Sequence, residues 1–139
     1  ALSQSRAPVC YNGDIFTEKD YRMFAERFPE ADRIMLGRGL IANPGLLSLI
    51  LTGKALEKEA LQTFHDRIYR DYRKVMSGDV NVLFKMKELW NYMQFLFDDS
   101  QKHIKRIRKA KSGAEYEDAV RTLFRCCVFV PDAGFRAEN

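Results

Sequence analysis

Hydrophobic positions in the first fifty residues form two short apolar runs separated by a helical pattern. Residues 8–12 (PVCYN) and residues 31–36, which contain an Ile-Met-Leu run, each predict a short buried strand. Apolar side chains recur at helical spacing over residues 18–28, and Thr17 is a suitable N-cap for this helix. A strand, a helix and a strand in this order predict a βαβ unit whose two strands are parallel.

The rest of the chain shows helical spacing alone. Helices are expected over residues 45–51, 56–76, 80–97, 101–111 and 114–127, followed by an irregular tail. The last four are amphipathic and joined by short connections, which predicts an antiparallel bundle. We therefore expect two parts that meet near Gly53: an α/β part at residues 1–53 and a helical part at residues 54–139.

The α/β part is too small to form a complete sheet. Two parallel strands cannot bury both their faces, because parallel sheets need cover on each side and further strands. The chain is therefore expected to be a portion of a longer protein. By itself, such a portion would satisfy its exposed strands by self-association.

Composition argues against a membrane-spanning protein, a disulfide-rich protein and a metal-binding protein. Of the 139 residues, 46% are hydrophobic and 30% are charged, and no apolar run is long enough to span a membrane. The three cysteines, two of them adjacent, do not resemble a disulfide framework, so a cytoplasmic location is expected. No Cys-x-x-Cys pair occurs and the two histidines are far apart, so no metal site is expected.

A glycine-containing turn follows each predicted strand. The first is Asn12-Gly13-Asp14, and the second is Gly37-Arg38-Gly39. Both turns are expected at the carboxyl edge of one parallel sheet, where α/β folds bind ligands. Glycines let backbone N–H groups approach an anion, and an arginine can bind two of its oxygens. The two turns together favour a phosphate site over the alternative of simple strand-ending turns.

Cations concentrate at residues 102–111 (KHIKRIRKAK), within a chain of net charge +4. If Ile104 and Ile107 face the core, an outward face remains that consists of Lys102, Lys105, Arg106 and Lys109. Lys85 and Lys87 on the preceding predicted helix would extend this face. A solvated helix face is one interpretation, and contact with nucleic-acid phosphates is the other.

The stretches YNGDIFT (residues 11–17) and DRIMLGRGLIANPGLL (residues 32–47) resemble the last two βα units of the tRNA-dihydrouridine synthases. These are flavin enzymes built on a (β/α)₈ TIM barrel that carries a C-terminal helical bundle. The resemblance covers the whole chain and is most specific over residues 11–47. It implies a mainly α fold here, in which an antiparallel helical bundle is preceded by the last two βα units of an incomplete barrel.

The resemblance also implies cofactors, a partner and site residues. The cofactor would be FMN, the reductant NADPH, and the reaction the reduction of uridine to dihydrouridine in tRNA. The FMN ribityl-phosphate would be lined by Asn12 and Asp14, with the phosphate bound by Gly37 and Arg38 and the backbone shaped by Gly13 and Gly39. The six lysine and arginine residues named above would bind tRNA.

The resemblance places no catalytic residue in this chain, because the family's proton-donating cysteine belongs to an earlier part of the barrel. The chain alone is therefore expected to be inactive. In KMKELWNYM, Glu88 stands where the family often shows His. Two other functions stay open: a flavin oxidoreductase that acts on a small molecule, and a non-catalytic RNA-binding helical module.

Overall fold

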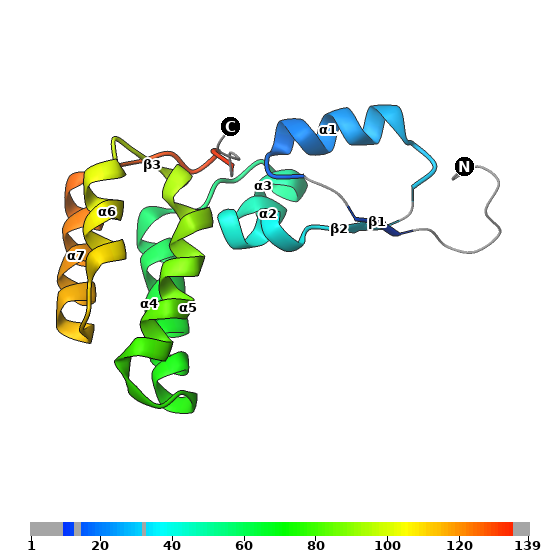
Figure 1. Ribbon diagram of the computed structural model, residues 1–139. Helices are drawn as coiled ribbons and strands as arrows, with labels where there is room; N and C mark the ends of the chain where they lie inside the picture. Colours follow the sequence, from blue (N-terminus) through cyan, green and yellow to red (C-terminus); the bar gives the residue numbers. More distant parts are fainter. Residues whose placement is uncertain (1–9, 13–14, 32, 135–139) are drawn as a thin grey trace.

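The computed structural model describes residues 10–12, 15–31 and 33–134, and it divides into a small α/β part and a helical bundle (Figure 1). The α/β part contains β1 (Cys10–Asn12), α1 (Glu18–Arg27), β2 (Arg33–Met35), α2 (Gly37–Ala42) and α3 (Leu46–Thr52). The bundle contains α4 (Lys58–Val75), α5 (Gly78–Met93), the 3₁₀ turn η2 (Gln94–Leu96), β3 (Phe97–Asp98), α6 (Gln101–Lys109), α7 (Gly113–Cys126) and β4 (Val128–Phe129). The described residues are mainly helical, as predicted.

The predicted βαβ unit is confirmed. Strands β1 and β2 are parallel, with Cys10 opposite Arg33 and Asn12 opposite Met35. Between them, α1 begins at a capping box: Thr17 Oγ1 accepts from the Asp20 amide at 3.1 Å, and the Asp20 carboxylate accepts from the Thr17 amide at 3.2 Å. The described residues of this sheet form two strands and do not close a barrel.

The glycine-rich segment after β2 differs from the prediction. We expected a turn at residues 37–39, but helix α2 begins at Gly37. The Leu40 amide donates to the Leu36 carbonyl oxygen at 2.8 Å, so residues 36–40 already form a helical turn. Close packing explains the glycine at position 39. A Cβ atom at Gly39 would lie 2.2 Å from the Ile15 carbonyl oxygen and 3.1 Å from Leu46 Cδ2, so the glycine lets α2 pack directly against the chain that follows β1.

The four predicted bundle helices are present as α4, α5, α6 and α7. Consecutive helices run antiparallel in Figure 1; α4 packs on α5, and α5 contacts both α6 and α7. The bundle also meets the α/β part, because α2 packs against α5. None of the described helices is long and apolar enough to cross a membrane.

The end of α5 and the tail correct two predictions. Helical spacing extended the second bundle helix to residue 97, but α5 ends at Met93 and Phe97 lies in β3. The tail expected to be irregular forms β4, which is antiparallel to β3 with Phe97 opposite Phe129. Phe97 leaves the helix because its ring packs edge-on against Phe124 of α7, with centroids 5.2 Å apart.

A buried polar network joins α4, α5 and α7 inside the apolar core. The Tyr116 hydroxyl lies 2.9 Å from Trp90 Nε1 and 2.7 Å from His65 Nε2. Because the indole N–H can only donate, Tyr116 accepts from Trp90. The Asp66 carboxylate beside Nδ1 can only accept, so in the neutral imidazole Nε2 is the acceptor and the Tyr116 hydroxyl donates to it. His65 therefore carries its proton on Nδ1 and donates it to the Asp66 carboxylate at 3.0 Å. The network satisfies both nitrogens of this buried imidazole.

Titration of this network is shifted by burial. His65 is 2% exposed, and removal from water lowers the pKa of His65 from its ordinary value of 6.5, with Asp66 opposing the shift in part. Burial likewise raises the pKa of Tyr116, and burial with the Glu117 carboxylate raises the pKa of Tyr69 to about 12. The imidazole and both phenols are therefore neutral near pH 7.

Candidate cofactor and nucleic-acid sites

The two predicted phosphate-binding turns start at the same edge of the β1–β2 sheet. Asn12 and Met35 are register partners at the carboxyl ends of parallel strands, and α2 begins two residues after Met35. Gly13 and Asp14 lie outside the described residues, and for Asn12 the backbone alone is described. The described geometry therefore brings Asn12 together with the Gly37 end of α2.

The start of α2 has features that suit an anion. The first N–H groups of a helix have no partner within the helix. A Cβ atom at Gly37 would meet no heavy atom of the described residues within 4 Å, so space is open beside this backbone. Arg38 is exposed, and its guanidinium carbon lies 5.9 Å from the centroid of the Phe16 ring. This contact holds the arginine of the second turn over the segment that follows the first.

The outward face of α6 carries a stripe of three lysines. Ile104 and Ile107 are buried, as the sequence predicted. The lysine stripe consists of Lys102, Lys105 and Lys109, all exposed. Among the described residues, these three side chains have no hydrogen-bond or ion-pair partner, so their charges are available to a partner molecule.

The two arginines of α6 are tied to its neighbours. Arg106 pairs with Asp118 of α7 and donates to Thr122 Oγ1 at 3.2 Å. On the opposite flank, Arg108 donates to Asn91 Oδ1 of α5 at 3.4 Å. Acidic side chains of α7 thus balance one edge of the basic face, which leaves the lysine stripe as its uncompensated centre.

The two predicted cations of α5 lie in different surroundings. Lys87 Nζ donates to the carbonyl oxygen of Ala110, at the end of α6, over 2.7 Å. It therefore satisfies a helix C-terminus and is half-buried. Lys85 is exposed, with Nζ 4.0 Å from the Glu88 carboxylate. Glu88, the position at which the sequence departs from the family pattern, therefore faces a lysine.

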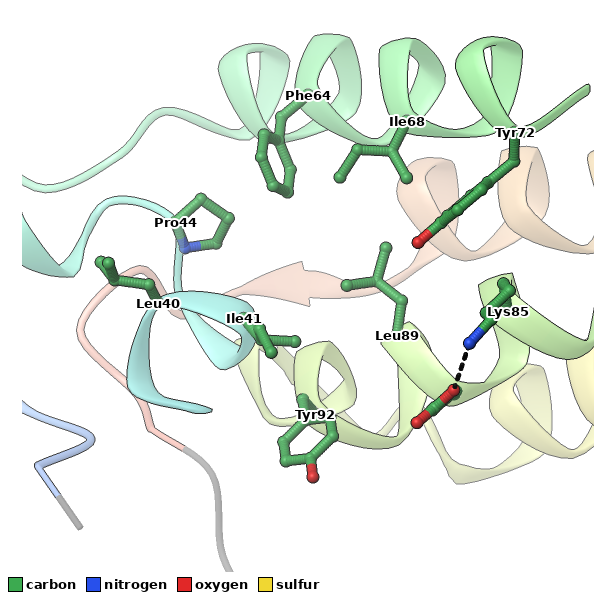
Figure 2. Close-up of a pocket in the computed structure, with 10 residues that line it drawn as sticks. Leu40, Ile41, Pro44, Phe64, Ile68, Tyr72, Lys85, Leu89 and Tyr92 are labelled. Atoms are coloured by element: carbon green, nitrogen blue, oxygen red, sulfur yellow. Dashed lines mark ion pairs between the residues drawn. The ribbon is translucent and has the colours of Figure 1, made fainter. Parts of the chain in front are cut away.

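An apolar groove of about 590 Å³ lies where α2 meets α4 and α5. Figure 2 shows Phe64 and Ile68 of α4 facing Leu89 of α5, with Lys85 at one end, where it pairs with Glu88. Its walls are formed by Leu40, Ile41, Pro44, Phe64, Ile68, Tyr72, Lys85, Glu88, Leu89 and Tyr92. Sequence reasoning missed this groove because three segments that are separate in the sequence line it.

The described residues contain no group of three His, Cys, Asp or Glu side chains that could hold a metal ion. Cys126 is exposed and Cys127 is buried, and both are free thiols. Burial raises the pKa of Cys127, which keeps this thiol protonated near pH 7.

Comparison with known families decides where the chain belongs. The sequence matches the family model for dihydrouridine synthase (Dus) over residues 2–129. The chain belongs to the dihydrouridine synthase family. No curated protein and no solved structure matches it significantly. The resemblance seen in residues 11–47 is thereby confirmed, and the dihydrouridine synthase family is one of oxidoreductases that act on tRNA.

Proposed function

We propose that this chain is the C-terminal part of an FMN-dependent tRNA-dihydrouridine synthase, which reduces uridine to dihydrouridine in tRNA with NADPH as reductant. The supporting observation is a parallel strand pair whose carboxyl edge carries Asn12 and the Gly37-Arg38 start of α2, joined to a helical bundle in a chain of this family. The rest of a (β/α)₈ barrel would come from sequence beyond these residues.

In this proposal, the α/β part binds the phosphate end of FMN. The open backbone at Gly37 and the exposed guanidinium of Arg38 fit a phosphate, and Gly13, Asp14 and Asn12 would complete its surroundings. FMN, when bound, supplies hydride transfer between NADPH and the uracil ring. The chain's own residues orient the cofactor, and the catalytic cysteine would lie elsewhere in the protein.

The bundle would bind tRNA through its basic face. The lysine stripe of α6 supplies three uncompensated charges at one helix surface, with Arg106 beside it, whereas Lys85 lines the groove between α2, α4 and α5. Such charges contact phosphates without reading sequence. Lys87 would act indirectly, by holding the end of α6 in place. We place the protein in the cytoplasm, where its free thiols Cys126 and Cys127 stay reduced.

The test is the reaction itself. The full-length protein is incubated with FMN, NADPH and unmodified tRNA, and dihydrouridine is measured in the digested tRNA. We expect dihydrouridine to form only when all three are present. Oxidation of NADPH without tRNA binding would instead indicate a flavin oxidoreductase for small molecules. Binding of tRNA without NADPH oxidation would indicate a non-catalytic RNA-binding module.

A further inference from the structure

The chain after α7 leaves the bundle and crosses to the α/β part. Beyond β4, the Val130 amide donates to the Leu96 carbonyl oxygen at 2.6 Å, and the Pro131 carbonyl oxygen accepts from Asn43 Nδ2 at 2.9 Å. Figure 1 shows this segment, in red, running from the bundle towards α1. We refer to residues 130–134 as the C-terminal strap.

One end of the strap is fixed by a buried side chain. Asn43 is 1% exposed and ends α2, where its backbone N–H donates to the Gly39 carbonyl oxygen at 2.9 Å. Its side-chain oxygen accepts from the Gly45 amide at 3.0 Å, while its side-chain nitrogen reaches Pro131. The side-chain amide of Asn43 therefore joins the strap to the end of α2. Leaving its oxygen or its nitrogen unpaired would be costly in free energy.

The other end of the strap presses on the segment that follows β1. A Cβ atom at Gly134 would lie 2.7 Å from the Phe16 carbonyl oxygen and 2.8 Å from Thr17 Cγ2. A residue with a side chain at position 134 would therefore push the strap away from Phe16. The Phe16 ring is the one over which the Arg38 guanidinium lies.

We propose that the C-terminal strap is a positioning element for the FMN phosphate, with Asn43 and Gly134 as its positioning residues. The strap contacts Phe16 and Thr17, after β1, through Gly134 and the end of α2 through Asn43, and so sets the spacing between α2 and this described segment. β1 and β2 pair over three residues each, which is little to hold that spacing alone. This inference rests on the proposed function.

The test compares FMN with riboflavin, which has the same ring system and no phosphate. In the full-length protein, Asn43→Ala and Gly134→Val should each weaken FMN binding about tenfold and change riboflavin binding less than about twofold, because displacing the site by a fraction of an ångström weakens its phosphate contacts first. The control is Tyr116→Phe, which removes buried hydrogen bonds in the bundle core away from the strap. It should lower the melting temperature and leave both dissociation constants unchanged.

The possible outcomes distinguish a failure of the strap inference from a failure of the proposed phosphate site. Equal loss of FMN and riboflavin affinity in the strap variants, or unchanged affinity for both, would overturn the inference. Wild-type protein that binds FMN no more tightly than riboflavin would instead refute the proposed phosphate site. If Gly134→Val does not fold, Gly134→Ala meets the same atoms with one methyl group. Hydrogen exchange at residues 15–17 should then be faster in the strap variants than in Tyr116→Phe, and unchanged exchange there would also overturn the inference.

Discussion

His65 is buried within the polar network of the bundle, and its protonation should make folding sensitive to acid. In the unfolded chain the imidazole takes up a proton near pH 6.5, whereas burial lowers the pKa of His65 in the folded protein. Below pH 6.5 the unfolded state therefore binds more protons, and stability falls as pH falls. Protonation of Nε2 would also remove the acceptor to which the Tyr116 hydroxyl donates.

We expect the melting temperature to be nearly constant from pH 8 to pH 7 and to fall below pH 6.5. His65 should lower the free energy of unfolding by at most about 1.4 kcal/mol for each pH unit. The measurement is thermal unfolding across this range by circular dichroism. His65→Gln, which cannot titrate, should lower the melting temperature at every pH and make its fall below pH 6.5 less steep. His103→Gln, at a half-exposed position of α6, is the matched His→Gln control outside the buried network. A His65→Gln variant with the wild-type slope would contradict this assignment.

Arg38 is the residue on which the proposed phosphate site depends most. In the full-length protein, Arg38→Ala should raise the dissociation constant for FMN about ten- to a hundredfold, because a charge-assisted contact to phosphate contributes about 1.5–3 kcal/mol. Fluorescence titration of the apoprotein with FMN measures this. Arg33→Ala is the control, since Arg33 is also exposed but lies at the opposite end of β2. Equal FMN affinity in both variants would place the phosphate elsewhere.

At the scale of single elements, α6 provides the sharpest test of RNA binding. Lys102→Glu with Lys105→Glu should weaken binding to different tRNAs about equally, because phosphate contacts carry no sequence information. The slope of log affinity against log salt should become shallower by roughly one unit for each phosphate that the variant no longer neutralises. Filter binding at several salt concentrations measures both effects. Stability should change by less than about 0.5 kcal/mol, because both side chains are exposed.

The control for α6 reverses two exposed cations on another helix, Arg70 and Lys74 of α4. If the effect belongs to the lysine stripe, this control keeps wild-type affinity and salt dependence. Equal weakening in both double variants would show that net charge, and not the surface of α6, governs binding. Unchanged tRNA binding in the α6 variant would show that the lysine stripe is a solvated helix face with no part in tRNA binding.

Elements were predictable where local chemistry determines them. Thr17 and Asp20 specify the start of α1 within one turn, and the buried positions Ile104 and Ile107 predicted the outward face of α6. Phe97 shows why other elements were not. It continues the apolar stripe of α5, and its departure into β3 depends on Phe124 and Phe129, which are distant in sequence. Pairing of this kind leaves no local signal.

The candidate site follows the same division. Gly37 and Arg38 were identifiable because a glycine-rich segment directly after a strand indicates a phosphate-binding turn from local sequence alone. Asn43 was not, since an Asn-Pro pair reads as a helix boundary and nothing nearby shows that its amide reaches Pro131. The groove between α2, α4 and α5 was hidden for the same reason. What packs locally can be inferred from the chain, whereas what joins its two parts cannot.

At the scale of the whole molecule, the α/β part has apolar surface that a single copy of this chain leaves in water. Met35 of β2 is 51% exposed, and Leu47 and Leu51 of α3 are 48% and 72% exposed. The described sheet has two strands, too few for a stable parallel sheet by itself. We therefore expect the 139-residue chain, produced alone, to retain no stoichiometric FMN after dialysis and to oxidise no NADPH. A yellow protein with one flavin per chain would contradict this.

The same exposed surface predicts self-association of the isolated chain. Open strand edges pair with other copies, and burial of apolar side chains such as Met35 and Leu51 adds to the driving force. Light scattering should give an apparent mass that rises with concentration. Met35→Lys places a charge on β2 and should shift the equilibrium towards the monomer, whereas Val75→Lys, at an exposed apolar position on the far end of α4, should not. The two variants separate strand-mediated association from general hydrophobic aggregation, because aggregation would respond to both. A wild-type chain that stays monomeric at all concentrations, with β2 protected from hydrogen exchange, would show that the two-stranded sheet needs no partner.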